Sequence, residues 1–97
     1  MNMRIEQPRQ AAWPAAARLL ARWLDRHERI DELLETLPPG LGGVERARCQ
    51  HLVYGVLRHH GRLDAALRRL VSHPPRFSTR AVLLMAGYEL LEGAVPP

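Results

Sequence analysis

The spacing of apolar residues along residues 49–57 is the feature that most constrains the fold of this chain. These residues recur at the i, i+3, i+4, i+7 and i+8 positions that form one face of an α-helix: Cys49, Leu52, Val53, Val56 and Leu57. The opposite side of this helix carries polar and aromatic side chains: His51, Tyr54, Arg58 and Arg62. The pattern predicts a two-sided helix, with one face in a core and the other free for a second role.

Gly55 lies beside that polar side. A glycine inside a helix costs about 1 kcal/mol relative to alanine. We expect a close neighbour to offset this cost, either another helix or the backbone of a ligand that presses against the helix surface.

Helical periodicity continues over most of the chain, and no segment shows the alternation of a strand. Five helices are predicted, over about residues 14–26, 30–36, 44–60, 62–72 and 78–91. Pro14 suits the first turn of the first helix, Gly61 the C-terminal cap of the third, and Ser78 the N-cap of the fifth. The fold class is therefore all-α, a compact bundle of about five helices. Residues 1–13 are predicted to be a loose arm before a single domain over residues 14–97.

Several packing expectations follow from the same periodicity. The fifth helix is apolar nearly all round, which predicts a central position with neighbours on several sides. Glu89 lies on that helix, and if it is buried an arginine is its simplest partner. The apolar faces predicted for the second and fourth helices are Ile30, Leu33, Leu34 and Leu37, and Leu63, Ala66, Leu67, Leu70 and Val71. Trp13 is expected to act as a hydrophobic staple and Trp23 as a core residue.

The charge balance is basic, with a formal net charge of +4 and an isoelectric point near 10.5. All 14 cationic side chains are arginine, whose planar fork suits phosphates and stacking on bases. This is typical of a small nucleic-acid binder, although a GC-rich genome also explains the absence of lysine.

The single cysteine, Cys49, excludes a disulfide framework and a zinc cluster, and its place on the apolar face predicts a buried thiol. The longest apolar run, Ala81–Tyr88, is far shorter than a membrane span. The first residues lack the apolar core of a signal peptide. We therefore expect a cytoplasmic protein without a membrane partner.

Four segments together resemble a known family: Glu45–Arg58 (ERARCQHLVYGVLR), Leu63–Leu67 (LDAAL), Val82–Leu91 (VLLMAGYELL) and Val95–Pro97 (VPP). Their order is similar to the NusB-type helical domain, and most closely to the N-terminal RNA-binding domain of rRNA (cytosine-C5) methyltransferases of the RsmB (Sun) type. The likeness runs from about Ala15 to Pro97.

The resemblance implies an RNA-binding domain, and it exposes one departure. NusB-type domains continue with further helices beyond the Val-Pro-Pro segment, and the methyltransferases continue into a catalytic domain. The chain is therefore expected to lack the last helices of the family, as a fragment or as a natural short form that a partner completes. It is not expected to be an enzyme by itself, with no cofactor in this chain, because S-adenosylmethionine belongs to the missing catalytic domain.

The predicted RNA-binding residues are arginines on three helices: Arg18, Arg22, Arg26, Arg58, Arg62 and Arg69. Arg18, Arg22 and Arg26 recur every four residues on the first helix, where Asp25 and Glu28 are near enough to neutralise part of the stripe. The resemblance favours this helix, because the first helix of NusB-type domains is associated with RNA contact. Arg58 has a structural alternative, a pairing with Glu89, and Arg68 points outward beside Arg69.

Other candidate residues are interpreted as structural. His59 and His60 point about 100° apart on a helix and so do not converge on one metal ion; His60 is expected to pack or cap. Tyr54 could stack on a base, but packing between helices beside Gly55 is favoured. No catalytic or metal-binding residue is predicted.

The sequence thus predicts an accessory domain that binds RNA, with 16S rRNA as the expected target. The alternatives are a protein-protein interaction module and an antitermination-type factor of the NusB class. Expected protein partners are a catalytic methyltransferase domain, a ribosomal protein, or a second copy of the chain bound through exposed apolar surface.

Overall fold

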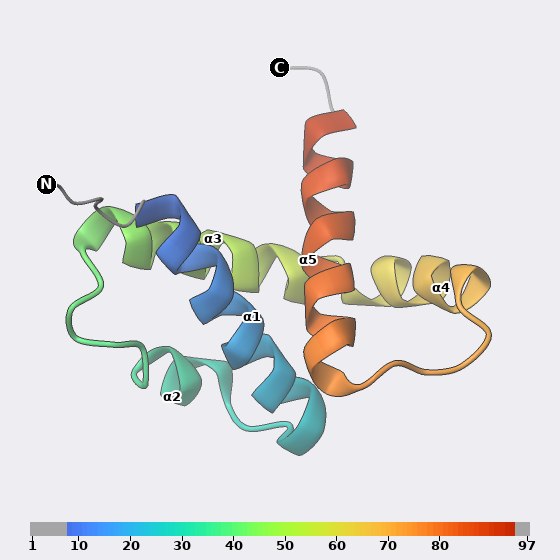
Figure 1. Ribbon diagram of the computed structural model, residues 1–97, viewed down its shortest axis with the longest axis horizontal. Coiled ribbons are helices and arrows are strands. Elements are labelled where there is room, and N and C mark those ends of the chain that lie inside the picture. Colours follow the sequence, from blue (N-terminus) through green and yellow to red (C-terminus); the bar gives the residue numbers. More distant parts are fainter. Residues whose placement is uncertain (1–7, 95–97) are drawn as a thin grey trace, which may run out of the picture.

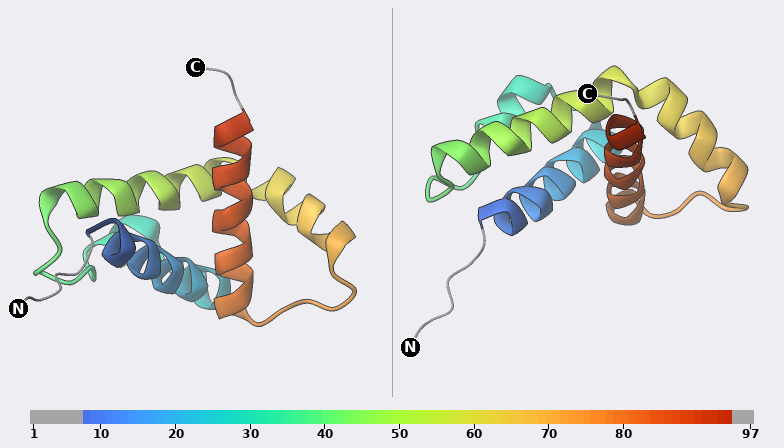
Figure 2. Two further views of the ribbon diagram at one scale, coloured as in Figure 1. Left: turned by 45° about the horizontal axis from the view of Figure 1, so that its top comes forward. Right: turned by 90° about the horizontal axis from the view of Figure 1, so that it is seen from above.

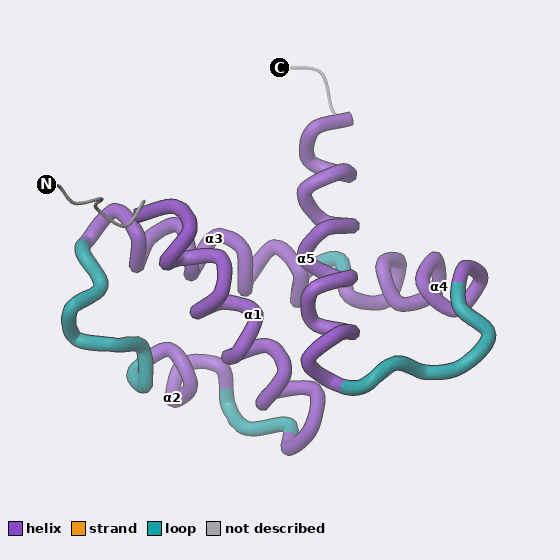
Figure 3. Tube along the Cα trace, in the orientation of Figure 1, coloured by secondary structure: helices purple, strands orange, loops and turns teal. Residues whose placement is uncertain are grey.

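The computed structural model describes residues 8–94, with side chains from residue 11 to residue 93. Within these residues the chain forms five helices and no strand, which confirms the all-α class. The helices are α1 (Pro8–Arg26), α2 (Ile30–Leu34), α3 (Gly43–Arg58), α4 (His60–Leu70) and α5 (Phe77–Ala94). Figure 3 shows how loops join them, the longest running from α2 to α3 and from α4 to α5.

α5 holds the central position that its apolar sequence predicts, because it contacts α1, α3 and α4. α1 and α3 pack on each other, and α2 packs on α1. Figures 1 and 2 show α1 and α4 on opposite sides of α5 in every view. The bundle is thus organised around α5, which separates its N-terminal part from α4.

The core is built from the apolar faces of four helices. Its largest fully buried side chains are Leu20, Leu33, Leu52, Val53, Val56, Leu84, Met85 and Cys49. Leu34 and Leu37 are also buried and Ile30 packs against the cluster, as predicted. The buried state of Cys49 is confirmed as well.

The prediction that α1 begins at Pro14 is wrong, because the helix begins at Pro8 and contains Pro14. A proline inside a helix removes one hydrogen bond to the preceding turn. Burial explains why the preceding turn is helical all the same: Ala12 is fully buried and Trp13 packs against the core. Residues 8–13 therefore belong to the helix, and Trp13 is not a hydrophobic staple that precedes it. Of the expected N-terminal arm, residues 1–7 lie outside the described residues.

The third helix ends earlier than predicted, and Gly61 is not its cap. α3 ends at Arg58, His59 adopts φ −108° and ψ 15°, and α4 begins at His60. His59 still donates its backbone N–H to Gly55, and its carbonyl accepts from Leu63. The His59 ring stacks on Tyr88, with centroids 5.9 Å apart. A single residue therefore turns the chain between two helices, and Gly61 lies exposed inside α4.

The predicted apolar face of α4 is only partly correct. Leu63 and Leu67 pack against the core, but Ala66 is exposed and the side chain of Leu70 is 82% exposed. α5 likewise begins at Phe77 rather than at an N-cap Ser78, and it leaves Leu90 76% exposed. Apolar periodicity predicted these helices, but not which of their faces would find a neighbour.

Asp64 is the buried residue of α4, and it links this helix to α5. Its carboxylate accepts a hydrogen bond from Arg80 at 2.6 Å and pairs with Arg68 at 3.0 Å. Burial acts to raise the pKa of Asp64, but the hydrogen bond and charge of Arg80, with the charge of Arg68, outweigh it and lower the pKa. The two arginines thus keep a nearly buried carboxylate ionised.

Gly55 has the close neighbour that the sequence predicts. It is buried, and a Cβ atom at this position would overlap the ring of Tyr88 on α5. The prediction that Tyr54 packs between helices is wrong: Tyr54 is 44% exposed, and the aromatic residue on Gly55 comes from α5.

We expect Gly55→Ala to lower the free energy of unfolding by about 1–3 kcal/mol, because the added methyl must displace Tyr88. This outweighs the gain of about 1 kcal/mol in helix propensity. Gly61→Ala is the matched control, since nothing lies within 4 Å of its new Cβ atom. Urea unfolding followed by circular dichroism measures both, and a Gly55→Ala variant as stable as Gly61→Ala would contradict the contact.

We expect the stability of the protein to depend on the ionisation of Asp64. Because folding lowers the pKa of this carboxyl, its contribution is present above the unfolded value of about 3.9 and is lost as the pH falls below it. The free energy of unfolding of wild type should therefore fall more between pH 7 and pH 3 than that of Asp64→Asn. Equal falls in the two proteins would show that Asp64 contributes nothing to the acid sensitivity.

Candidate RNA-binding surface

The arginine stripe of the first helix lies along the outer side of α1. Glu28 neutralises part of it, with Arg22 at 2.8 Å and Arg26 at 3.9 Å. Asp25, the other acid expected here, forms no ion pair within the described residues. Arg18 is exposed, and among the side chains of residues 11–93 it has no ion-pair partner. It is therefore the member of the stripe most open to an outside anion.

Arg18 and Arg22 stand between two grooves. One groove, of about 230 Å³, lies between α1 and the loop that follows α2, where Thr36, Leu37 and Pro38 complete its lining. The other, of about 640 Å³, lies between α1 and α5 and has mostly apolar walls. Both arginines line both grooves, so they form a ridge that is open on two sides.

Arg46, on α3, adds a cation near this ridge, and sequence reasoning missed it. Its guanidinium donates to the carbonyl of Pro38, which lines the smaller groove, at 3.1 Å. Burial raises the pKa of the Cys49 thiol, while the charges of Arg46 and Arg18 both act to lower it. Two cations from different helices therefore lie near one thiol. The available signal was spacing, since position 46 is one helical turn before the buried Cys49.

Arg58 and Arg62 lie at a different place. They are exposed and line a groove of about 430 Å³ with His59, Tyr88 and Glu92. The α5 residues that line the α1–α5 groove, Ser78 and Val82, come ten residues before Tyr88 and Glu92, which line this one. The two grooves are therefore about 15 Å apart along the axis of α5.

Arg69 occupies a third location, exposed in the last turn of α4. Its neighbour Arg68 is engaged with Asp64. The structure thus brings Arg18 and Arg22 together, and separately Arg58 and Arg62, but it does not gather the six arginines on one surface. As RNA contacts, all six remain predictions.

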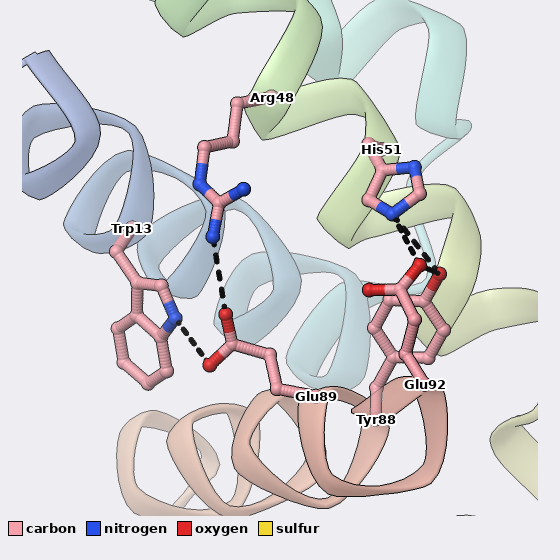
Figure 4. A network of polar contacts seen from close by, with 6 residues as sticks. All are labelled: Trp13, Arg48, His51, Tyr88, Glu89 and Glu92. Carbon is pink, nitrogen blue, oxygen red and sulfur yellow. Dashed lines mark hydrogen bonds and ion pairs between the residues drawn. The ribbon is translucent and has the colours of Figure 1, made fainter. Parts of the chain in front are cut away.

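A network of polar contacts joins α1, α3 and α5 (Figure 4). The indole N–H of Trp13 donates to Glu89 at 3.1 Å, and Arg48 donates to the other oxygen of this carboxylate at 3.3 Å. Glu89 thus has an arginine partner, as expected, but the partner is Arg48 rather than Arg58. Its side chain is 37% exposed rather than buried.

The second half of this network surrounds Glu92. The His51 Nε2 atom lies 2.7 Å from its carboxylate, and the Tyr88 hydroxyl donates to it at 3.0 Å. These two hydrogen bonds lower the pKa of Glu92, and burial with the Glu92 interaction raises the pKa of Tyr88. The polar face of α3 is therefore used in part to hold α5, which leaves Arg58 as its exposed arginine, next to Arg62 at the start of α4.

The two adjacent histidines serve separate contacts. His59 stacks on Tyr88, while His60 meets the edge of Trp23, with centroids 5.2 Å apart. Trp23 packs against the core and is partly buried, in agreement with its predicted place in the core.

Among the described residues, no three histidine, cysteine or acidic side chains lie together as metal ligands would. No described helix is long and apolar enough to cross a membrane.

This architecture defines an all-α class of domain, in which a basic first helix packs on a central apolar helix. The chain belongs to the NusB family, which matches it over residues 9–97. It is 36% identical over 85 residues to ribosomal RNA small subunit methyltransferase B of Sodalis glossinidius (strain morsitans). This match covers 84% of the chain and 20% of the relative, so the chain spans about a fifth of that protein's length. No solved structure gives a significant match.

We expect Glu89→Ala to lower the free energy of unfolding by about 1 kcal/mol, because it removes the acceptor shared by Trp13 and Arg48 at a partly exposed site. The control is Arg29→Ala, which removes the pair of Arg29 and Asp31, whose side chains are 74% and 65% exposed. That variant should change the free energy of unfolding by about 0.5 kcal/mol or less. Equal losses in urea unfolding would mean that the link between the three helices is no stronger than a surface ion pair.

Proposed function

We propose that this chain is an RNA-binding accessory domain of an rRNA cytosine-C5 methyltransferase, and that Arg18 and Arg22 bind phosphates of the RNA. The observation that carries the proposal is the α1 ridge, on which two arginines one turn apart stand between two grooves. The grooves leave the guanidinium groups accessible from both sides, as contact with an extended polyanion requires.

The partners of these arginines support the assignment. Arg18 has no ion pair within residues 11–93, so an RNA phosphate would meet an uncompensated cation. Arg22 shares Glu28 with Arg26, at side-chain exposures that keep the Arg22 pair weak in water. An RNA phosphate, which accepts a bidentate pair from arginine, can replace this carboxylate.

Arg58, Arg62 and Arg69 are proposed as outer contacts. The Arg58 groove and the Arg18 ridge lie at different ends of α5, about 15 Å apart along the helix axis. An RNA that contacts both must span this distance, and its shape would decide which of these arginines is used.

The similarity to a ribosomal RNA small subunit methyltransferase supports small-subunit rRNA as the RNA that this domain binds. We infer that the domain holds small-subunit (16S) rRNA and helps to position a nucleotide for a catalytic domain that is not among these residues. That domain would bind S-adenosylmethionine, and the present residues would contribute affinity and orientation but no catalytic step. The compartment would be the cytoplasm, where rRNA is modified.

A second candidate function is protein interaction, and one observation favours it. Leu70 and Leu90 expose large apolar side chains on α4 and α5, as an interface residue would. The partner would be the catalytic domain, a ribosomal protein or a second copy of the chain. An antitermination-type role would keep the RNA contacts and change only the RNA target.

We expect the purified chain to bind small-subunit rRNA fragments in a salt-dependent manner. If about four phosphates are neutralised, log K should fall against log salt with a slope of roughly −3 to −4. Arg18→Glu/Arg22→Glu should weaken binding by about tenfold or more and reduce the slope by about 2, because two phosphate contacts are lost. Fluorescence anisotropy across a salt series measures both quantities.

The matched control is Arg29→Glu/Arg76→Glu, which changes the net charge equally at two exposed arginines outside the predicted set. It should retain most of the affinity. A slope near zero in wild type, or equal weakening in the two double variants, would reject phosphate binding at the ridge. A protein interface built on Leu70 and Leu90 would be unaffected by either change.

A further inference from the structure

The groove between α1 and α5 is larger than the arginine ridge needs for phosphate binding. Its lining includes three small side chains on α1, Pro14, Ala17 and Ala21, which recur at i, i+3 and i+7. Two larger apolar side chains, Trp13 on α1 and Val82 on α5, also line it. The small residues of α1 therefore leave space between the larger side chains of the groove.

Trp13 is held in place at this groove. Its indole N–H is bonded to Glu89, and Figure 4 shows the ring nitrogen directed at that carboxylate. The hydrogen bond fixes the ring from the α5 side while the indole also lines the groove. The Trp13 ring is thus a preset aromatic surface at the groove, which lowers the entropic cost of binding a flat partner.

The charges at the groove select its occupant. Its only charged lining residues in the described part of the chain are Arg18 and Arg22. A mostly apolar groove with two cations in its lining is complementary to a ligand that combines a flat apolar face with adjacent negative charges. A nucleotide of an unpaired RNA segment has this chemistry, since its base presents a π-face and its neighbours are phosphates.

We propose that the α1–α5 groove receives an unpaired nucleobase of the bound RNA, while Arg18 and Arg22 hold the flanking phosphates. This rests on the proposed function, to which it adds a preference for single-stranded over duplex RNA. The base contacts Trp13 and Val82 and covers the small side chains of α1. Duplex RNA, whose bases are stacked and paired, reaches the arginines but not the groove.

Filling the groove tests the inference. Ala17→Leu places a larger side chain in the lining of the groove, and Ala65→Leu, at an exposed α4 position outside the groove, is the matched control. The probes are a twelve-nucleotide oligoadenylate and an RNA duplex of the same length. Ala17→Leu should weaken binding of the single strand about tenfold and change binding of the duplex less than twofold, whereas Ala65→Leu should change neither.

Each outcome decides between the two proposals. If wild type binds neither RNA, the proposed function fails; if it binds both but Ala17→Leu weakens both equally or neither, only the base site fails. Circular dichroism checks the fold of the variants. Should Ala17→Leu unfold, the emission of Trp13 in a Trp23→Phe background is the second measurement: the oligoadenylate should quench it and the duplex should not, and the opposite result overturns the inference.

Discussion

The close contact between Gly55 and Tyr88 is the constraint on which the rest of the structure depends. It brings α3 and α5 together where a larger side chain at position 55 would hold them apart. At that spacing His51 reaches Glu92, and Arg48 reaches Glu89. The same tyrosine ring stacks on His59, where the chain turns from α3 into α4. One glycine thus sets both the packing of the central helix and the direction of the next.

The central place of α5 also decides how the basic residues can act. It receives Trp13 of α1 through Glu89 and holds α4 through Arg80 and Asp64. Because α1 and α4 lie on opposite sides of α5, their arginines cannot form one continuous surface. The ridge of Arg18 and Arg22 therefore carries the proposed function, with the other arginines as contacts that the shape of the RNA would select.

Local sequence patterns predicted the structure correctly where a single physical effect decided the outcome. The apolar spacing of residues 49–57 predicted α3 and its buried Cys49, and Gly55 correctly indicated a close neighbour. Errors arose where tertiary contacts competed with a local signal. Burial of Ala12 extends α1 back beyond Pro14, and stacking of His59 on Tyr88 turns the chain before Gly61. The prediction that Glu89 pairs with an arginine was correct, but which arginine it meets depended on how α3 and α5 cross.

The sequence by itself determined the all-α class, the approximate place of each helix and the basic character of the first one. These properties depend on periodicity and charge, which can be read within a few turns of helix. Only the tertiary structure decided that Tyr88 rather than Tyr54 packs on Gly55, that Arg48 pairs with Glu89, and that Arg18 and Arg22 border an apolar groove. These are distances between residues far apart in the chain, and they are set by the packing angles of whole helices, which no short pattern encodes.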